Sequence, residues 1–330
     1  MTERGAALLK RMLGGDRVAL AKLLTVVENR EPDTAEVMSR LHGLTERAAV
    51  VGITGPPGAG KSTLVDRLIA HWRGDGKRVG VVAVDPSSPF SGGAVLGDRI
   101  RMQSHFLDEG VFIRSLSARG NVGGLARAAR DVARLLAAFG NDIVVVETVG
   151  VGQNEFDIMR LADSVVVVLV PEAGDTIQAM KAGLLEIADV FVVNKADRAG
   201  ATRMKSELDA MLHLRPATDW TVPVLLTVAS DGSGTAELAE ALAAHRHHLA
   251  VSGDGRKRIA AARRDEFVSG LRDELVRRLD GALHHGELLP LLAELERGDI
   301  DPYAALRRAL DDPHWLDSVV RERGAAGAKS

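Results

Sequence analysis

The amino-acid sequence predicts an α/β fold in which a mostly parallel β-sheet is covered by helices on both faces. From about residue 49 onward, short runs rich in β-branched residues alternate with helical stretches. Continuous apolar runs of this kind are typical of strands buried on both faces. Before and after this region the pattern is helical. We therefore expect a helical N-terminal arm (1–48), an α/β core (49–250) and a helical C-terminal arm (251–330).

Individual elements follow from the spacing of apolar residues. The N-terminal arm is expected to be helical over 6–46, with a break at Pro32. In the C-terminal arm we expect a helix over 256–281, a second one after Pro290 and a disordered tail at 324–330. The runs that predict strands are 50–54, 79–84, 111–116, 143–148, 165–170, 190–194 and 222–228. The helix over 256–281 carries an apolar stripe that must be buried somewhere, formed by Phe267, Leu271, Leu275 and Leu279.

Composition excludes several classes of function. Aromatic residues make up only 3% of the 330 residues, which argues against stacking platforms for single-stranded nucleic acid. The net charge of −3 gives no bulk attraction to nucleic acid or to an anionic membrane. The chain has no cysteine, so thiolate metal sites and a cysteine nucleophile are excluded. Residues 1–15 show no signal peptide and no apolar run could span a bilayer, so we expect a cytoplasmic protein with no nucleic-acid or membrane partner.

The segment Gly55–Ser62, directly after the first predicted strand, matches the pattern G-x-x-x-x-G-K-[ST] of a phosphate-binding loop. Glycines let the backbone turn so that consecutive N–H groups point at a phosphate, helped by the N-terminus of the following helix. In this pattern Lys61 reaches the β- and γ-phosphates and the Ser62 hydroxyl ligates Mg²⁺. The predicted nucleotide contacts are Gly55, Pro56, Pro57, Gly58, Ala59, Gly60, Lys61, Ser62 and Thr63.

A second motif, Asn194-Lys195-Ala196-Asp197, follows the strand predicted at 190–194 and indicates guanine as the base. The Asp197 carboxylate can accept hydrogen bonds from both N1–H and N2–H₂ of guanine, and adenine presents no such pair. Asn194 would brace the loop, and the Lys195 stem would lie over the purine. A third part of such a site, a backbone turn, is expected near residues 227–230. The exact residue stays open among Val228, Ala229 and Ser230.

Two further segments are candidates for the Mg²⁺ and hydrolysis side of the site. Glu147 ends the strand predicted at 143–148 and would hold a water on Mg²⁺, while the Gly150 N–H would face the γ-phosphate. Gln153 lies in the same loop, which should sense hydrolysis.

The Pro- and Gly-rich stretch that begins at Asp85 is too long for a tight turn and is expected to order on Mg²⁺·GTP. Asp85 is a candidate for outer-sphere contact with Mg²⁺, and Asp98 or Arg101 for orienting the attacking water. From residue type alone these three would be surface charges.

Histidines and basic clusters outside these motifs favour no additional chemistry. His245-Arg246-His247-His248 and His284-His285 have no cysteine partners, and we expect them in a solvated stretch at a helix end, without a metal. The basic residues 256–258 are followed closely by acidic ones, which favours a solvated helix face over nucleic-acid binding.

Five segments together resemble the MeaB/ArgK family of G3E-type P-loop GTPases, which includes the human methylmalonic-aciduria type A protein. They are GPPGAGKST, AVDPSSPFSGGAVLGDRIRM, VETVGVGQNE, GDTIQAMKAGLLEIAD and NKAD, and the resemblance extends over residues 6–280. It implies that switch I corresponds to 85–101, switch II to 147–155 and a third switch, with Lys181, to 174–185. It also assigns Asp85, Asp98 and Arg101 to the Mg²⁺ and water side of the site.

The resemblance also implies a function and partners. These are GTP hydrolysis coupled to an adenosylcobalamin-dependent acyl-CoA mutase, usually methylmalonyl-CoA mutase, where the GTPase gates cobalamin loading and protects or reactivates the mutase. A cobalamin adenosyltransferase is a further candidate partner, and the C-terminal arm is expected to form a homodimer. Two alternatives stay open: a phosphotransferase of the arginine-transport kinase type, for which we find no acceptor pocket with its own base, and a nickel-insertion GTPase, for which the Cys/His motif is missing.

Overall fold

The computed structural model describes residues 1–45, 48–85, 103–105, 107–117, 122–148, 159–171, 183–215, 219–286 and 288–312. The chain divides into two compact units, Met1–Arg256 and Lys257–Ser330. The first unit contains the N-terminal helices together with the sheet. The tail expected to be disordered, 324–330, lies outside the described residues.

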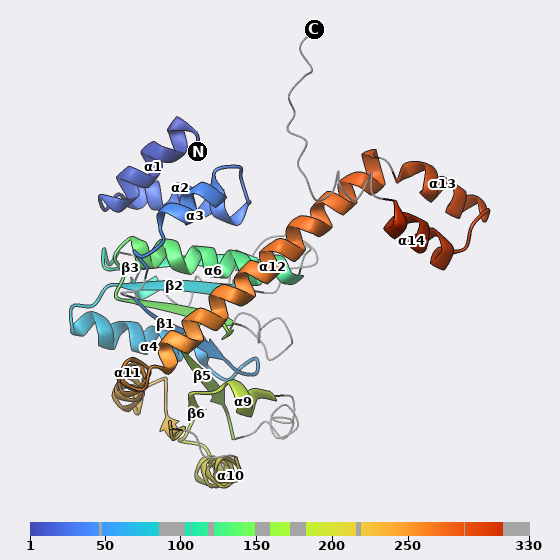
Figure 1. Cartoon of the computed structure of the whole chain (residues 1–330). Coiled ribbons are helices and arrows are strands. Elements are labelled where there is room, and N and C mark those ends of the chain that lie inside the picture. Colours follow the sequence, from blue (N-terminus) through green and yellow to red (C-terminus); the bar gives the residue numbers. More distant parts are fainter. Residues whose placement is uncertain are drawn as a thin grey trace. The chain divides into compact units, whose positions relative to one another are not determined.

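The first unit is built on a parallel sheet whose described strands run in the order β3-β2-β4-β1-β5-β6-β7 (Figure 1). Each strand coincides with one of the predicted apolar runs, and the predicted fold class is confirmed. β1 lies between β4 and β5, so later strands continue on both sides of it. In open parallel sheets a ligand binds at such a point, outside the carboxyl ends of the strands. The strands are β1 (Ala49–Thr54), β2 (Val79–Asp85), β3 (Val111–Ser117), β4 (Ile143–Thr148), β5 (Ser164–Leu169), β6 (Val190–Asn194) and β7 (Val224–Thr227).

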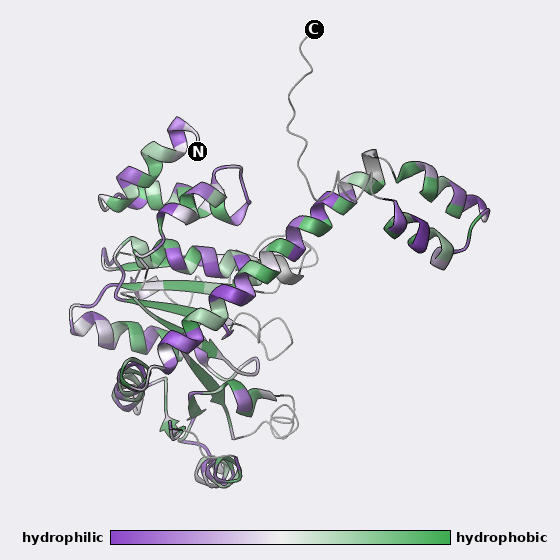
Figure 2. Ribbon diagram, in the orientation of Figure 1, coloured by the Kyte–Doolittle hydropathy of each residue, from purple (hydrophilic) through white to green (hydrophobic). Residues whose placement is uncertain are grey.

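Helices cover both faces of the sheet. Successive residues of each strand point to opposite faces, so a continuous apolar strand contributes to the core on each side. Val144 and Val146 of β4 join a core formed with the N-terminal helices, α6 (Val122–Ala138) and α10 (Ala201–His213). Val145 joins the opposite core, formed with α4 (Lys61–Gly74) and α11 (Thr235–Ser252). α4 and α6 therefore lie on opposite sides of the sheet in Figure 1, and Figure 2 shows the strands between them as hydrophobic.

The N-terminal arm consists of α1 (Glu3–Leu13), α2 (Arg17–Glu28) and α3 (Thr34–Arg40). The Asp16 carboxylate accepts hydrogen bonds from the N–H groups of Val18 and Ala19, which caps the start of α2. Next to this cap, Arg17 donates hydrogen bonds to the carbonyl oxygens of Glu109 and Val111, at 2.6 and 2.8 Å. The arm is thus attached to the edge strand β3.

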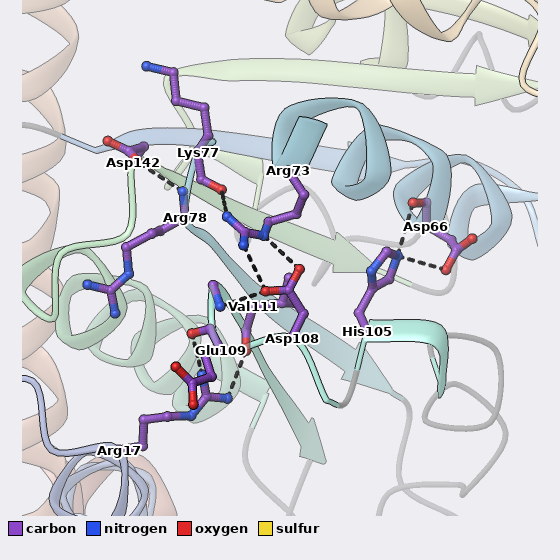
Figure 3. Close-up of polar contacts among 11 residues, drawn as sticks. Arg17, Asp66, Arg73, Lys77, Arg78, His105, Asp108, Glu109, Val111 and Asp142 are labelled. Atoms are coloured by element: carbon purple, nitrogen blue, oxygen red, sulfur yellow. Dashed lines mark hydrogen bonds and ion pairs between the residues drawn. The ribbon is translucent and has the colours of Figure 1, made fainter. Parts of the chain in front are cut away.

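The chain that leads into β3 is tied to α4 at two places, as Figure 3 shows. In the short 3₁₀ helix η1 (Gln103–His105), Nε2 of His105 lies 3.1 Å from Oδ1 of Asp66. Further along, Arg73 donates hydrogen bonds of 2.7 and 2.8 Å to the two carboxylate oxygens of Asp108. These contacts fix the chain to α4 immediately after residues 86–102, the stretch that holds most of the expected switch I.

One sequence-based expectation is wrong: His245 does not lie in a solvated stretch. It is fully buried, because it lies on the same face of α11 as Leu238, Leu242 and Leu249. Its Nδ1 is 2.7 Å from the Ser164 hydroxyl, and its Nε2 is 3.3 Å from a carboxylate oxygen of Asp189. The spacing that places His245 inside is visible in the sequence, but the short basic motif around it suggested a solvated helix end.

The second unit is helical, with most of α12 (Asp254–His285) followed by α13 (Leu289–Arg297) and α14 (Pro302–Asp311). Hydrophilic and hydrophobic residues alternate along α12 in Figure 2. Phe267, Leu271 and Leu275 are exposed by 70%, 50% and 37%, whereas Leu279 packs against Leu288. None of the helices in the described part of the chain is both long and apolar enough to cross a membrane.

Candidate nucleotide-binding site

The predicted phosphate-binding loop connects the end of β1 to the first turn of α4. Two of its glycines have positive φ in confined positions. At Gly55 (φ 145°) an added Cβ would lie 2.0 Å from the carbonyl oxygen of Val168, and at Gly60 (φ 86°) it would lie 2.4 Å from Nδ2 of Asn194. Because any side chain there would collide with these atoms, the loop conformation requires glycine. The loop ends at the N-terminus of α4, where the helix dipole favours an anion.

The Lys61 side chain is folded against this loop. It is buried, and its Nζ donates hydrogen bonds to the carbonyl oxygens of Gly55 and Pro56, at 2.9 and 3.0 Å. A cation is thereby held beside the helix N-terminus. The two together give the loop a positive potential suited to a polyphosphate.

Ser62 and Glu147 bring two oxygen ligands together beside the loop. The Ser62 hydroxyl, in the first turn of α4, donates a 2.7 Å hydrogen bond to Oε1 of Glu147, near the end of β4. Both side chains are buried. Next to them the Thr148 hydroxyl donates to the Thr54 hydroxyl across the ends of β4 and β1, at 3.0 Å. A hydroxyl and a carboxylate are hard oxygen ligands, so this donor set fits Mg²⁺, which takes few protein ligands and completes its shell with waters and phosphate.

A cavity of about 190 Å³ lies at the carboxyl ends of β6 and β7 and beside the phosphate-binding loop. It collects residues from three predicted segments that are far apart in the chain. Its lining is Gly60, Thr63, Asn194, Lys195, Asp197, Arg198, Val228, Ala229 and Ser230.

Asn194 connects the walls of this cavity. Its Nδ2 donates a 2.8 Å hydrogen bond to the carbonyl oxygen of Ala59 in the phosphate-binding loop. Its Oδ1 accepts hydrogen bonds from the Thr227 hydroxyl and the Ala229 N–H, at 3.0 and 3.1 Å. The side chain is buried, so each of these bonds is shielded from water. Asn194 therefore fixes the loop at the phosphate end and the turn at 227–230 in one arrangement.

Lys195 and Asp197 complete the wall formed by the second motif. Lys195 has a φ of 56°, a left-handed conformation that is costly for a residue with a side chain and occurs mostly where the surroundings enforce it. The following residue, Ala196, donates its N–H to the carbonyl oxygen of Thr227 at 3.0 Å. Asp197 is exposed and lines the cavity. Its carboxylate is therefore accessible to a base that enters from solvent.

Several predicted site residues lie outside the described part of the chain: Asp98, Arg101, Gly150, Gln153 and Lys181. Asp85 is the last residue of β2, whose carboxyl end belongs to the same edge of the sheet as the ends of β1 and β4. The roles expected of all these residues stay predictions.

Sequence reasoning missed two residues that contact the cavity or its walls. Arg198 lines the cavity. Its position directly after the Asn194–Asp197 motif is a signal that could have included it. Arg67 donates two hydrogen bonds to the turn at 229–230. It could not have been found from local pattern, because its partners lie 162 and 163 residues further along the chain.

The glycine loop with its lysine, the Ser62–Glu147 pair and the cavity at the second motif define this protein as a P-loop GTPase. It belongs to the MeaB family: the family model described as "Methylmalonyl Co-A mutase-associated GTPase MeaB" matches residues 20–284.

Relatives agree with this membership. A Pyrococcus abyssi protein named as a GTPase is 47% identical over 302 residues, which cover 90% of this chain and 93% of the relative. The mouse mitochondrial methylmalonic aciduria type A homolog is 34% identical over 262 residues, covering 74% of this chain and 63% of that protein. Among solved structures, one described as an LAO/AO transport system kinase matches with a TM-score of 0.67 and 26% identity, covering 97% of this chain and 99% of the other.

Proposed function

We propose that this GTPase is a chaperone of an adenosylcobalamin-dependent acyl-CoA mutase, with methylmalonyl-CoA mutase as the expected client. The support is the family membership together with the relationship to the methylmalonic aciduria type A homolog. In this role the nucleotide state would gate cobalamin loading and protect or reactivate the mutase. A cobalamin adenosyltransferase is a further proposed partner.

The proposed binding mode assigns the phosphates to the glycine loop and the base to the cavity. Lys61 would stabilise negative charge on the β- and γ-phosphates, assisted by the N-terminus of α4. Asp197 would accept the N1–H and N2–H₂ groups of guanine, and the Lys195 stem would cover one face of the purine. The observation that carries this assignment is the Asn194 side chain, which joins the phosphate-binding loop to the turn at 227–230.

Ser62 and Glu147 would hold Mg²⁺, with Asp85 in outer-sphere contact. When bound there, Mg²⁺ would neutralise charge that develops on the phosphate oxygens during transfer to water. The chain's own contribution to that step is positioning. Lys61 would keep the γ-phosphate in place, the Gly150 N–H would face it, and Asp98, Arg101 or Gln153 would orient the attacking water.

The decisive experiment combines the purified GTPase with a purified adenosylcobalamin-dependent methylmalonyl-CoA mutase and measures phosphate release. We expect free protein to hydrolyse GTP slowly and the mutase to raise kcat by about tenfold or more, equivalent to ~1.4 kcal/mol of barrier. Lys181→Ala should keep the basal rate and lose most of the stimulation, because we propose that Lys181 couples the third switch to switch II. Lys61→Ala controls for contaminating hydrolysis.

One result would contradict the client assignment, and another would contradict only the role of Lys181. If the mutase leaves the rate of the parent unchanged and does not co-purify with either the GTP- or the GDP-loaded form, the client assignment fails. If Lys181→Ala is stimulated as fully as the parent, the client assignment stands and Lys181 has no coupling role.

A further inference from the structure

Arg67 of α4 connects this helix to the turn at residues 228–234 by two hydrogen bonds. Its Nε donates a 3.1 Å hydrogen bond to the carbonyl oxygen of Ala229, and its Nη2 donates a 2.6 Å hydrogen bond to the carbonyl oxygen of Ser230. The guanidinium is planar and its donors have fixed directions, so two bonds to consecutive carbonyls determine the orientation of both peptide groups.

Internal contacts shape the rest of this turn. The Val228 carbonyl oxygen accepts hydrogen bonds from the N–H groups of Asp231 and Gly232, at 3.2 and 2.9 Å. The Asp231 carboxylate accepts a 2.8 Å hydrogen bond from the Ser233 N–H, which lowers the pKa of that carboxyl; the nearby positive charge of Arg67 lowers it further. The turn therefore folds locally, and Arg67 orients its carbonyl groups at Ala229 and Ser230 toward α4.

Fixing these carbonyl groups also fixes N–H groups. The peptide bond between Ala229 and Ser230 is trans, so the N–H of Ser230 points opposite to the carbonyl of Ala229. Since that carbonyl faces Arg67, the Ser230 N–H faces away from α4. Ala229 and Ser230 both line the cavity, as does the exposed residue Asp197.

We propose that Arg67 is a positioning residue for base recognition: it holds the 229–230 turn so that the backbone N–H of Ser230 meets the O6 acceptor of guanine. Adenine carries an amino donor at this position and would oppose an N–H group. Arg67 would thus act on the O6 edge, while Asp197 acts on the N1 and N2 edge. The inference rests on the proposed guanine cavity. It adds Arg67, which is not among the residues that line the cavity, as a residue that determines base specificity.

The test compares nucleotides that differ at one edge of the base. In 6-thio-GDP, sulfur replaces the O6 acceptor while N1–H and the 2-amino group remain; in IDP, O6 remains and the 2-amino group is missing. Dissociation constants for GDP, 6-thio-GDP, IDP and ADP are measured on the full chain by competition with a fluorescent guanine nucleotide. The variants are Arg67→Met and Arg67→Lys. Arg40→Met is the matched control, because Arg40 pairs with Glu36 on an exposed face of α3.

We expect Arg67→Met to raise the Kd of GDP by about tenfold, since two charge-assisted hydrogen bonds to the turn are lost. The Kd of 6-thio-GDP should change by less than about twofold, so the preference for GDP over 6-thio-GDP collapses. The ratio of GDP to IDP affinity should not change. Arg67→Lys should fall between parent and Arg67→Met, because one ammonium cannot orient two carbonyls, and Arg40→Met should match the parent.

Three outcomes separate failure of this inference from failure of the cavity. Equal weakening of GDP, 6-thio-GDP and IDP would show that Arg67 only maintains the local fold, and would overturn the inference. Unchanged GDP affinity in Arg67→Met would overturn it as well. If the parent binds ADP as tightly as GDP, the guanine cavity is misassigned and the inference falls with it. Thermal unfolding of Arg67→Met and Arg67→Lys shows whether a loss of binding follows from a loss of fold.

Discussion

The Ser62 hydroxyl and the Glu147 carboxylate are joined by a 2.7 Å hydrogen bond in a buried position beside the phosphate-binding loop. Each group lies where its oxygen could ligate Mg²⁺ instead. The contact links the start of α4 to β4, and the two groups that form it are the proposed metal ligands. When Mg²⁺ is bound, these oxygens would contact the metal instead of each other, so the charge of Glu147 should affect the requirement for Mg²⁺.

Replacing Glu147 by Gln keeps the size of the side chain and its ability to accept the Ser62 hydrogen bond, but removes the charge. We expect the Mg²⁺ concentration for half-maximal GTP hydrolysis to rise by about tenfold or more. GDP affinity measured without Mg²⁺ should stay close to that of the parent. A Mg²⁺ titration of phosphate release checks this, with Glu207→Gln on the exposed face of α10 as the control. An unchanged Mg²⁺ requirement would remove Glu147 from the metal site.

Asp197→Asn tests the other end of the site. The amide replaces one carboxylate oxygen by a donor, so one of the two guanine donors loses its acceptor and meets another donor. GDP affinity should fall by about tenfold or more, and XDP, whose 2-oxo group suits the amide, should bind better than it does to the parent. Competition assays with GDP, XDP and ADP measure both changes. If the variant keeps the parent's order of affinities, Asp197 does not contact the base.

Two glycines of the phosphate-binding loop provide a matched pair. Gly58 has a φ of 76° with open space where a Cβ would be, whereas at Gly60 the Cβ would lie 2.4 Å from Nδ2 of Asn194. Gly58→Ala should therefore cost only the left-handed backbone, about 1–2 kcal/mol of unfolding free energy. Gly60→Ala should cost more, because it also displaces the side chain that joins the loop to the 227–230 turn. Urea unfolding of the parent and both variants measures these losses of unfolding free energy.

GDP binding gives a second readout for the same pair. We expect Gly60→Ala to weaken GDP by a larger factor than Gly58→Ala. Equal losses of stability and affinity in the two variants would mean that Asn194 adapts freely, and its proposed role in connecting the two ends of the site would be wrong.

The sequence predicts those features of the fold and the site that are encoded within a few consecutive residues. Strands such as β5 and β6 were found from continuous apolar runs, because burial on both faces leaves a signal within a few residues. The glycine loop and the Asn194–Asp197 motif are also local, since a phosphate and a base each impose a short backbone conformation. Their meeting at one cavity follows from parallel strands ending at the same edge.

Other features depend on contacts between distant segments and could not be read locally. Arg67 has the spacing of an ordinary exposed helix residue, and only the fold brings it to Ala229. His245 was misplaced for a similar reason: a short histidine-rich motif resembles a solvated helix end, while its burial is set by packing of α11 on the sheet and by Ser164.

The pair formed by Arg73 and Asp108 predicts a pH effect on stability. The hydrogen bond from Arg73 holds the pKa of Asp108 below its usual range, with a further contribution from the Gly110 N–H. A carboxyl with a lowered folded-state pKa stabilises the protein above its unfolded pKa of about 4, and this stabilisation is lost as pH falls through the folded pKa. Asp108→Asn should therefore cost ~1 kcal/mol at pH 7.

The difference in unfolding free energy between the parent and Asp108→Asn should shrink as the pH is lowered below about 4. Urea unfolding of parent and variant at several pH values measures it, with Asp209→Asn in the exposed Lys205–Asp209 pair as control. A stability difference that is the same at pH 3 and at pH 7 would rule out the ionised carboxylate as its source.

The apolar stripe of α12 predicts self-association. Phe267, Leu271 and Leu275 follow one another at four-residue intervals and are exposed by 70%, 50% and 37%. Each apolar side chain that leaves water contributes about 25 cal/mol per Å² of buried area, and a second copy of the same stripe is a self-complementary partner for a two-fold dimer. We therefore expect light scattering at micromolar concentration to give about twice the 35.1 kDa mass of the chain.

Substitution of the stripe tests whether it is the dimer contact. Phe267→Asp combined with Leu271→Asp places two charges on the stripe and should shift the mass toward that of one chain, because an unpaired charge buried in an apolar interface is strongly unfavourable. The described contacts of α12 with Leu288 involve Leu279, which is left intact, so far-ultraviolet circular dichroism should show the helix preserved. The matched control is Tyr303→Asp on α14, also exposed but off the stripe. A parent that scatters as one chain would refute the dimer, and a double variant that keeps the doubled mass would place the dimer contact elsewhere.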